Sequence, residues 1–148
     1  WIWSSHVWNM FDFGCAARDE GGVAGRNNKG LVTLDRKVKK DSYYIYQAYW
    51  NKKPMVHLCG KRYAQRAGET TEIRVYSNQP SVTLFLNGEK VEELSAEKVF
   101  VFTVALKDGF NILQLRHETL QYQFECHTYD DSGKSRKRTE DLCIAGSQ

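Results

Sequence analysis

The sequence predicts a mainly β protein in which a single strand–loop–helix unit precedes an antiparallel β-sandwich. Before residue 54, an apolar run is followed by a long glycine-rich loop and an aromatic stretch with helical spacing. After residue 54, apolar and polar residues alternate in short runs, which is the period of strands with one buried face. The 148 residues suffice for one ordinary domain and a smaller additional part.

The first expected strand is Val7–Phe13, which is apolar except at Asn9 and Asp12. Such a run is typical of a strand buried on both faces, as in a parallel barrel. A loop from about residue 14 to residue 40 follows, rich in glycine and in charged residues. Loops of this length are either functional or disordered.

The first expected helix follows the N-cap candidates Asp41 and Ser42. Tyr43, Tyr46 and Trp50 recur at i, i+3 and i+7, so they would share one apolar stripe. A proline at position 54 cannot continue a helix, and we therefore place a boundary there.

Seven short strands are expected after this boundary. Asn87-Gly88 separates two of them and favours a hairpin with a type I′ turn, and Asp108-Gly109 predicts a second turn of the same kind. The spacing of about ten residues fits an immunoglobulin-like antiparallel β-sandwich. The expected strands are Met55–Cys59, Thr71–Ser77, Val82–Leu86, Val91–Leu94, Lys98–Leu106, Ile112–Arg116 and Gln121–His127.

These patterns divide the chain into three parts: a β/α unit at residues 1–53, the sandwich at residues 54–129, and a polar tail or linker at residues 130–148. The net charge of +3 is too small to indicate nucleic-acid binding, and no apolar run approaches the roughly 20 residues of a membrane span. We interpret the basic run at residues 36–40 as solvated surface, and we expect neither a nucleic-acid nor a membrane partner.

The cysteines at positions 15, 59, 126 and 143 form no Cys-x-x-Cys pair, and we expect free thiols. A zinc site would need His57, Cys59, Cys126 and His127. Neighbours on a strand point to opposite faces, so these four cannot converge, and we expect no metal.

The N-terminal sequence resembles that of a known protein family. Residues 8–13 read Trp-Asn-Met-Phe-Asp-Phe and residues 18–22 read Arg-Asp-Glu-Gly-Gly. Residues 25–36 read Gly-Arg-Asn-Asn-Lys-Gly-Leu-Val-Thr-Leu-Asp-Arg. This text resembles the end of the catalytic barrel in family 2 glycoside hydrolases, the β-galactosidase and β-glucuronidase group. Residues 62–66, 75–78 and 86–88 resemble the immunoglobulin-like domain that follows the barrel.

The resemblance implies the last β/α unit of a (β/α)8 barrel and the next domain, cut off from the catalytic carboxylates. The family's Asn-Glu acid/base motif and its nucleophilic glutamate are absent, so no residue here is expected to be catalytic and the chain alone should be inactive. The parent would be a retaining β-galactosidase-type enzyme with no cofactor. Two alternatives are a β-glucuronidase-type parent and a free-standing sandwich module that binds carbohydrate or protein.

The resemblance places Trp8 at the tip of the last barrel strand, where its ring would stack on the sugar. It also matches Asn27 and Lys29 to an Asn-x-Lys motif that contacts the sugar carboxylate in β-glucuronidases. The alternatives are a core tryptophan and a solvated lysine. We interpret Asp12, Asp19, Glu20 and Asp35 as turn and surface groups, because nothing around them builds an enclosed pocket.

The expected partner is a carbohydrate substrate, bound through the full-length enzyme. Residues 1–50 would lose their barrel neighbours in the isolated chain. We expect them to be poorly ordered, folded back on the sandwich, or buried in a homo-oligomer.

Overall fold

The computed structural model describes residues 1–66, 70–107, 109–118 and 120–128. The chain forms two compact units, Trp1–Gln47 and Ala48–Gln148, and each is described by itself. None of the helices in the described residues is long and apolar enough to cross a membrane. The expected tail at residues 130–148 lies outside the described residues, and the boundary at residue 54 stays a prediction.

The N-terminal unit contains a β-hairpin where the sequence predicted a loop. Strand β1 (Phe13–Glu20) pairs antiparallel with β2 (Val23–Asn27). Gly21 and Gly22 join them with φ angles of 65° and 72°, which glycine adopts without steric cost. A Gly-Gly pair between two short runs is a hairpin signal that our interpretation missed.

The predicted strand Val7–Phe13 is wrong in its position, because β1 begins at Phe13. The preceding residues make an isolated parallel bridge between Phe11 and Val32, with hydrogen bonds from Leu31 N–H to Asn9 O (3.0 Å) and from Asp12 N–H to Val32 O (2.9 Å). Within the described residues, this short bridge is the β-pairing that residues 7–12 make. A regular ladder therefore does not form along the apolar run.

The helix forms where the sequence predicts it, as α1 (Asp41–Trp50). Its expected apolar stripe is not buried, since Tyr43 and Tyr46 are half-buried and Trp50 is 70% exposed. Ala48 is the helical residue that is fully covered.

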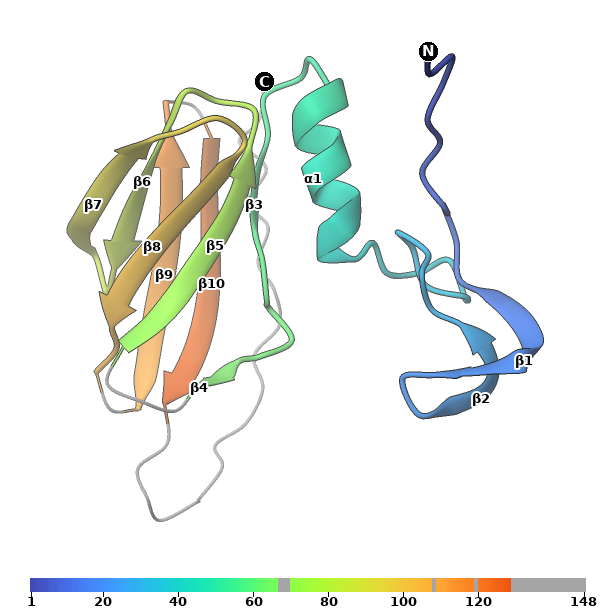
Figure 1. Ribbon diagram of the computed structural model, residues 1–148. Helices are drawn as coiled ribbons and strands as arrows, with labels where there is room; N and C mark the ends of the chain where they lie inside the picture. The colour runs from blue at the N-terminus through green and yellow to red at the C-terminus, as the bar shows by residue number, and fades with distance from the viewer. Residues whose placement is uncertain (67–69, 108, 119, 129–148) are drawn as a thin grey trace. The chain divides into compact units, whose positions relative to one another are not determined.

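Two facing sheets form the C-terminal unit (Figure 1), and the predicted sandwich is confirmed. The larger sheet has the strand order β4-β10-β9-β6-β7, and the smaller has the order β3-β5-β8. All pairs are antiparallel except β4 with β10. The strands are β3 (Val56–Leu58), β4 (Gln65–Arg66), β5 (Thr70–Ser77), β6 (Ser81–Leu86), β7 (Glu89–Ser95), β8 (Val99–Ala105), β9 (Phe110–His117) and β10 (Leu120–Thr128).

The core lies between the two sheets and is built from alternate residues of each strand. In β8, Phe100, Phe102 and Val104 are buried, whereas Val101 and Thr103 are exposed. Period-two burial of this kind is what the sequence pattern predicted. The remaining fully buried side chains of the core include Leu58, Ile73, Val75, Val82, Leu84, Leu113, Leu115 and Cys126.

One of the two predicted turns forms the expected hairpin. Asn87 and Gly88 join β6 to β7 with φ angles of 54° and 87°, as a type I′ turn requires. Gly109 also has a positive φ of 87°, but β8 and β9 belong to different sheets. The second hairpin prediction is therefore wrong, because this turn carries the chain from one sheet to the other.

Replacing one buried residue of β8 should destabilise the sandwich far more than replacing its exposed neighbour. Phe100→Ala removes a fully buried ring and should lower the free energy of unfolding by about 3–5 kcal/mol. Val101→Ala, at a position that is 43% exposed, should change it by less than about 0.5 kcal/mol. Urea denaturation of both variants measures the difference, and equal losses would contradict the assigned strand faces.

Candidate functional site

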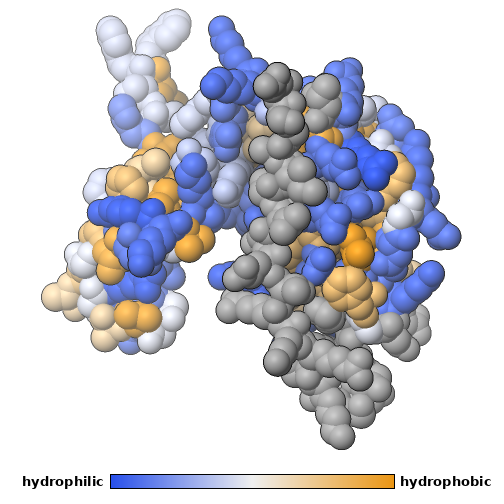
Figure 2. Space-filling view, turned by 180° about the vertical axis from the view of Figure 1, so that it is seen from behind, coloured by the Kyte–Doolittle hydropathy of each residue, from blue (hydrophilic) through white to orange (hydrophobic). Residues whose placement is uncertain are grey.

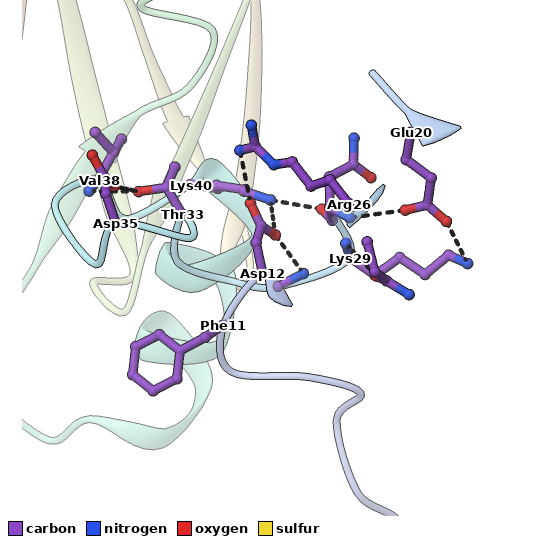
Figure 3. Close-up of polar contacts among 12 residues, drawn as sticks. Phe11, Asp12, Glu20, Arg26, Lys29, Thr33, Asp35, Val38 and Lys40 are labelled. Atoms are coloured by element: carbon purple, nitrogen blue, oxygen red, sulfur yellow. Dashed lines mark hydrogen bonds and ion pairs between the residues drawn. The ribbon is translucent and has the colours of Figure 1, made fainter. Parts of the chain in front are cut away.

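The N-terminal unit is organised around the buried carboxylate of Asp12. This residue is fully buried, although it is a carboxylate within a mostly apolar run. Its Oδ1 accepts hydrogen bonds from Lys40 Nζ (2.6 Å) and from the backbone N–H of Gly30 (2.9 Å), and its Oδ2 lies 3.3 Å from Arg26 Nη2. Figure 3 shows the side chains of Lys40 and Arg26 converging on the carboxylate from different parts of the chain.

Burial on its own would raise the pKa of Asp12, because it removes water from the charged form. The hydrogen bonds from Lys40 and Arg26, the charge of Lys40 and the Gly30 N–H outweigh this effect, and the pKa lies below its ordinary value. Asp12 is therefore a buried anion held by two cations, whose side chains are 29% and 30% exposed.

Asp12 holds the loop that carries the expected sugar contacts. Arg26 precedes the Asn27–Lys29 segment and Gly30 follows it, so the carboxylate is bonded at both ends of the segment. Lys40 Nζ also donates to the carbonyl oxygen of Asn28, 2.6 Å away. These contacts fix the position of the segment within this unit.

Gly30 lies against the backbone of the Asp12 segment. A Cβ atom added at Gly30 would collide with the backbone atoms Asp12 N and Phe11 C. Backbone atoms cannot rotate away as a side chain can, so this position requires glycine.

The expected lysine contact is paired inside the unit. Lys29 is half-exposed, and its Nζ lies 3.3 Å from Oε1 of Glu20. The other oxygen of Glu20 accepts the backbone N–H of Asn28 at 2.8 Å. Asn27 is buried, and its Oδ1 accepts the backbone N–H of Lys29 at 3.1 Å. Asn27 therefore shapes the turn that presents Lys29.

Trp8 lies on an open apolar groove in the same unit. The side chain is 72% exposed, and its ring meets Phe13 edge-on, with centroids 6.2 Å apart. The guanidinium of Arg36 lies 3.9 Å from the centre of the Phe11 ring and donates to the carbonyl of Asp12 at 3.1 Å. The groove, of about 370 Å³, is lined by Trp8, Asn9, Met10, Phe11, Phe13 and Arg36.

Apolar residues gather at the surface of the N-terminal unit in the space-filling view (Figure 2). Trp8, Met10, Phe11, Leu34 and Val38 are 36–72% exposed. A concentration of exposed apolar side chains is typical of a surface that binds a ligand or another protein.

The structure brings Asn27 and Lys29 together, but the lining of the groove at Trp8 includes neither of them. Whether these residues contact a sugar stays a prediction. The interpretation of Asp12 as a turn or surface group is wrong, because its side chain is fully buried among its partners. Glu20 is also mostly covered, with 18% of its side chain exposed.

The basic run at residues 36–40 is not simply a solvated surface. Lys40 reaches the buried Asp12 carboxylate, Arg36 covers the Phe11 ring, and Lys39 lies 4.8 Å from the centre of the Tyr43 ring. The sequence carries one signal for this arrangement: a carboxylate within an apolar run needs a cation if it is buried.

Two of the described cysteines are free thiols, as the sequence analysis expected. Cys15 and Cys126 are free, and burial raises the pKa of the Cys126 thiol. His57 and Cys59 are buried. The side chain of His127 and the whole of Cys143 lie outside the described residues.

Comparison with known proteins gives the resemblance an independent basis. Residues 68–123 match the family model described as "Domain of unknown function (DUF4982)". A β-glucuronidase of Bacteroides fragilis is 42% identical over 118 residues, which is 77% of this chain and 17% of that protein. A putative β-glucuronidase of Formosa agariphila is 39% identical over 88 residues.

Solved structures agree with these sequence relatives. The FMN-binding β-glucuronidase from Facaelibacterium prausnitzii L2-6 is 63% identical and has a TM-score of 0.83, over 86% of this chain and 20% of that one. A putative β-galactosidase from Bacteroides fragilis is 39% identical, with a TM-score of 0.77, over 82% of this chain and 19% of that one.

The chain therefore resembles a segment of bacterial β-glucuronidases and β-galactosidases, and the similarity to glycoside hydrolase family 2 is confirmed. It spans a fifth or less of the length of these relatives.

Removing the Asp12 carboxylate should unfold the loop that it holds. Asp12→Ala leaves Lys40 and Arg26 without their anion and should cost about 3 kcal/mol or more. Asp19→Asn, an exposed carboxylate on β1, is the matched control and should cost less than about 0.5 kcal/mol. Hydrogen exchange at Gly30 and Val32 measures the loss, and unchanged protection would contradict the account.

The same interaction sets a pH dependence. A carboxyl whose folded pKa is lowered stabilises the fold above its unfolded pKa, and this contribution is lost as the pH falls through the folded pKa. The protection should therefore decline below about pH 4, near the unfolded pKa. The pH dependence should be weaker in Asp12→Ala.

A methyl group at Gly30 should also destabilise the loop that Asp12 holds. Gly30→Ala forces backbone atoms apart and should cost about 1–3 kcal/mol or more. Gly14→Ala is the control, since its Cβ would meet one atom at 4.0 Å and its φ is not positive. Thermal denaturation compares the two variants, and a Gly30→Ala protein as stable as Gly14→Ala would contradict the close approach.

Proposed function

We propose that this chain is part of a retaining β-glycosidase and that its N-terminal unit forms one edge of the sugar site. The relatives support this proposal, since they are named β-glucuronidases and a putative β-galactosidase. The observation that carries it is that Trp8 is exposed beside an apolar groove. Trp8 belongs to the stretch of sequence that resembles the end of the barrel.

Trp8 suits sugar binding because a pyranose ring has an apolar face of C–H groups that stacks on an aromatic plane. An exposed tryptophan keeps this plane available. In a barrel enzyme, the carboxyl ends of the strands face the active site, and the resemblance assigns Trp8 to the end of the last strand.

Lys29 would supply a cation at the same edge. An ammonium is a compact donor for a sugar carboxylate or hydroxyl, and the Asn27 turn holds the lysine backbone in place. Under this proposal Asn27 acts mainly by shaping the turn, because its side chain is buried.

The hydrolysis itself requires two carboxyl groups about 5–5.5 Å apart in a retaining enzyme. We propose that these groups belong to the rest of the full-length enzyme and that the isolated chain is inactive. The sandwich then serves as an accessory region. Residues 1–50 would be covered by the rest of the enzyme, or in its absence by a second copy of the chain.

The sugar is either a β-galactoside, which was our first expectation, or a β-glucuronide. The curated relatives favour the glucuronide by their names, and the putative β-galactosidase favours the galactoside. An ammonium at Lys29 is compatible with both, because it can donate to a hydroxyl as well as to a carboxylate.

The proposal is tested with the full-length protein that contains this chain. It should hydrolyse 4-nitrophenyl β-glucuronide or β-galactoside, whereas the isolated chain should not. Trp8→Ala should raise KM about three- to tenfold through lost stacking. Tyr63→Ala is the matched control, because Tyr63 is an exposed aromatic residue of the sandwich, outside residues 1–50, and its loss should leave KM unchanged.

Hydrolysis by the isolated chain would contradict this account of the chain. A full-length protein that cleaves neither glycoside would refute the assignment as a glycosidase. An unchanged KM in Trp8→Ala would remove Trp8 from the sugar site.

A further inference from the structure

Glu20 is the carboxylate that faces the expected sugar-binding lysine. It ends β1, across the hairpin from the segment that carries Lys29. Its Oε1 lies 3.3 Å from Lys29 Nζ and 3.5 Å from Arg18 Nη1, and its Oε2 accepts the Asn28 N–H at 2.8 Å. Figure 3 shows Glu20 and Lys29 side by side at the end of this network.

The donors around Glu20 match those that a free carboxylate would select. An ammonium and a backbone N–H directed at the two oxygens of one carboxyl group form charge-assisted hydrogen bonds. In this structure, the carboxylate of Glu20 itself occupies these donors. A carboxylate on a sugar would have to share Lys29 with Glu20 or displace it.

Glu20 is anionic at neutral pH. The Asn28 N–H is the largest influence on its pKa, and together with Lys29 and Arg18 it holds the pKa below the ordinary value, against a smaller opposing effect of burial. The side chain is 18% exposed, so solvent screens the pair only in part.

We propose that Glu20 is a specificity-determining residue that occupies Lys29 and thereby weakens binding of acidic sugars relative to neutral sugars. This inference rests on the proposed function, because it requires Lys29 to reach the sugar. A uronate meets both the cation and the anion of the Glu20–Lys29 pair, so much of the attraction is cancelled. A neutral sugar is not repelled by Glu20, because it carries no charge.

Glu20→Gln isolates this effect. Glutamine keeps an oxygen that can accept the Asn28 N–H, so the turn can stay closed while the charge beside Lys29 is lost. In the full-length enzyme, the variant should lower Ki for D-glucuronate about two- to fivefold, the range expected for a partly exposed ion pair. Ki for D-galactose should stay within the error of measurement.

Two further variants make the result specific. Asp19→Asn removes the same charge one residue away, where the side chain is exposed, and should leave both Ki values unchanged. Lys29→Met should raise Ki for D-glucuronate, and Glu20→Gln should then have no further effect in the double variant. Melting temperatures of all variants exclude a general loss of structure.

The outcomes separate this inference from the function on which it rests. A full-length protein that hydrolyses neither glycoside refutes both. An active enzyme in which Glu20→Gln leaves Ki for D-glucuronate unchanged, raises it, or acts equally on D-galactose refutes only the role of Glu20. The same holds if Asp19→Asn reproduces the effect, or if the effect persists in the Lys29→Met background.

Discussion

The N-terminal unit depends on one buried anion. Asp12 carries a negative charge at a fully buried position, and a charge there is tolerated only if cations and N–H groups replace the lost water. Lys40, Arg26 and Gly30 do so, and in doing so they tie together positions 12, 26, 30 and 40. In a unit with few buried apolar residues, this polar network takes much of the role that a hydrophobic core has elsewhere.

The two units of the chain are therefore held by different physical interactions. The sandwich is stabilised by an apolar core between two hydrogen-bonded sheets. The N-terminal unit exposes Trp8, Met10, Phe11 and other apolar side chains. Exposure of this kind suits a segment that, in a larger enzyme, packs against neighbouring strands and lines a binding site.

Much of the sandwich is predictable from the sequence, because its signal is local. Burial on one sheet face imposes period two on β5, β6, β8 and β9, and Asn87-Gly88 marks a turn by its own conformational preference. Strand β4, with two residues, is too short to show a period. The turn at Gly109 carries no sign of which sheet the next strand joins, since that depends on long-range pairing.

The site was less predictable, because its contacts join distant residues. The partners of Asp12 lie 14, 18 and 28 positions away, so the residues next to it in the sequence do not identify the groups that bind its carboxylate. The family resemblance singled out Trp8, Asn27 and Lys29, but not Glu20, which pairs with Lys29 across a hairpin that we had expected to be a loop.

The central claim is that this N-terminal unit borders the sugar site of a larger β-glycosidase. A crystal structure of the full-length protein with a bound sugar ligand tests it most directly. The account predicts that the sugar ring lies within about 4 Å of the Trp8 ring and that Lys29 Nζ is within hydrogen-bonding distance of a sugar oxygen. A sugar bound elsewhere, with Trp8 packed into a protein core, would contradict it.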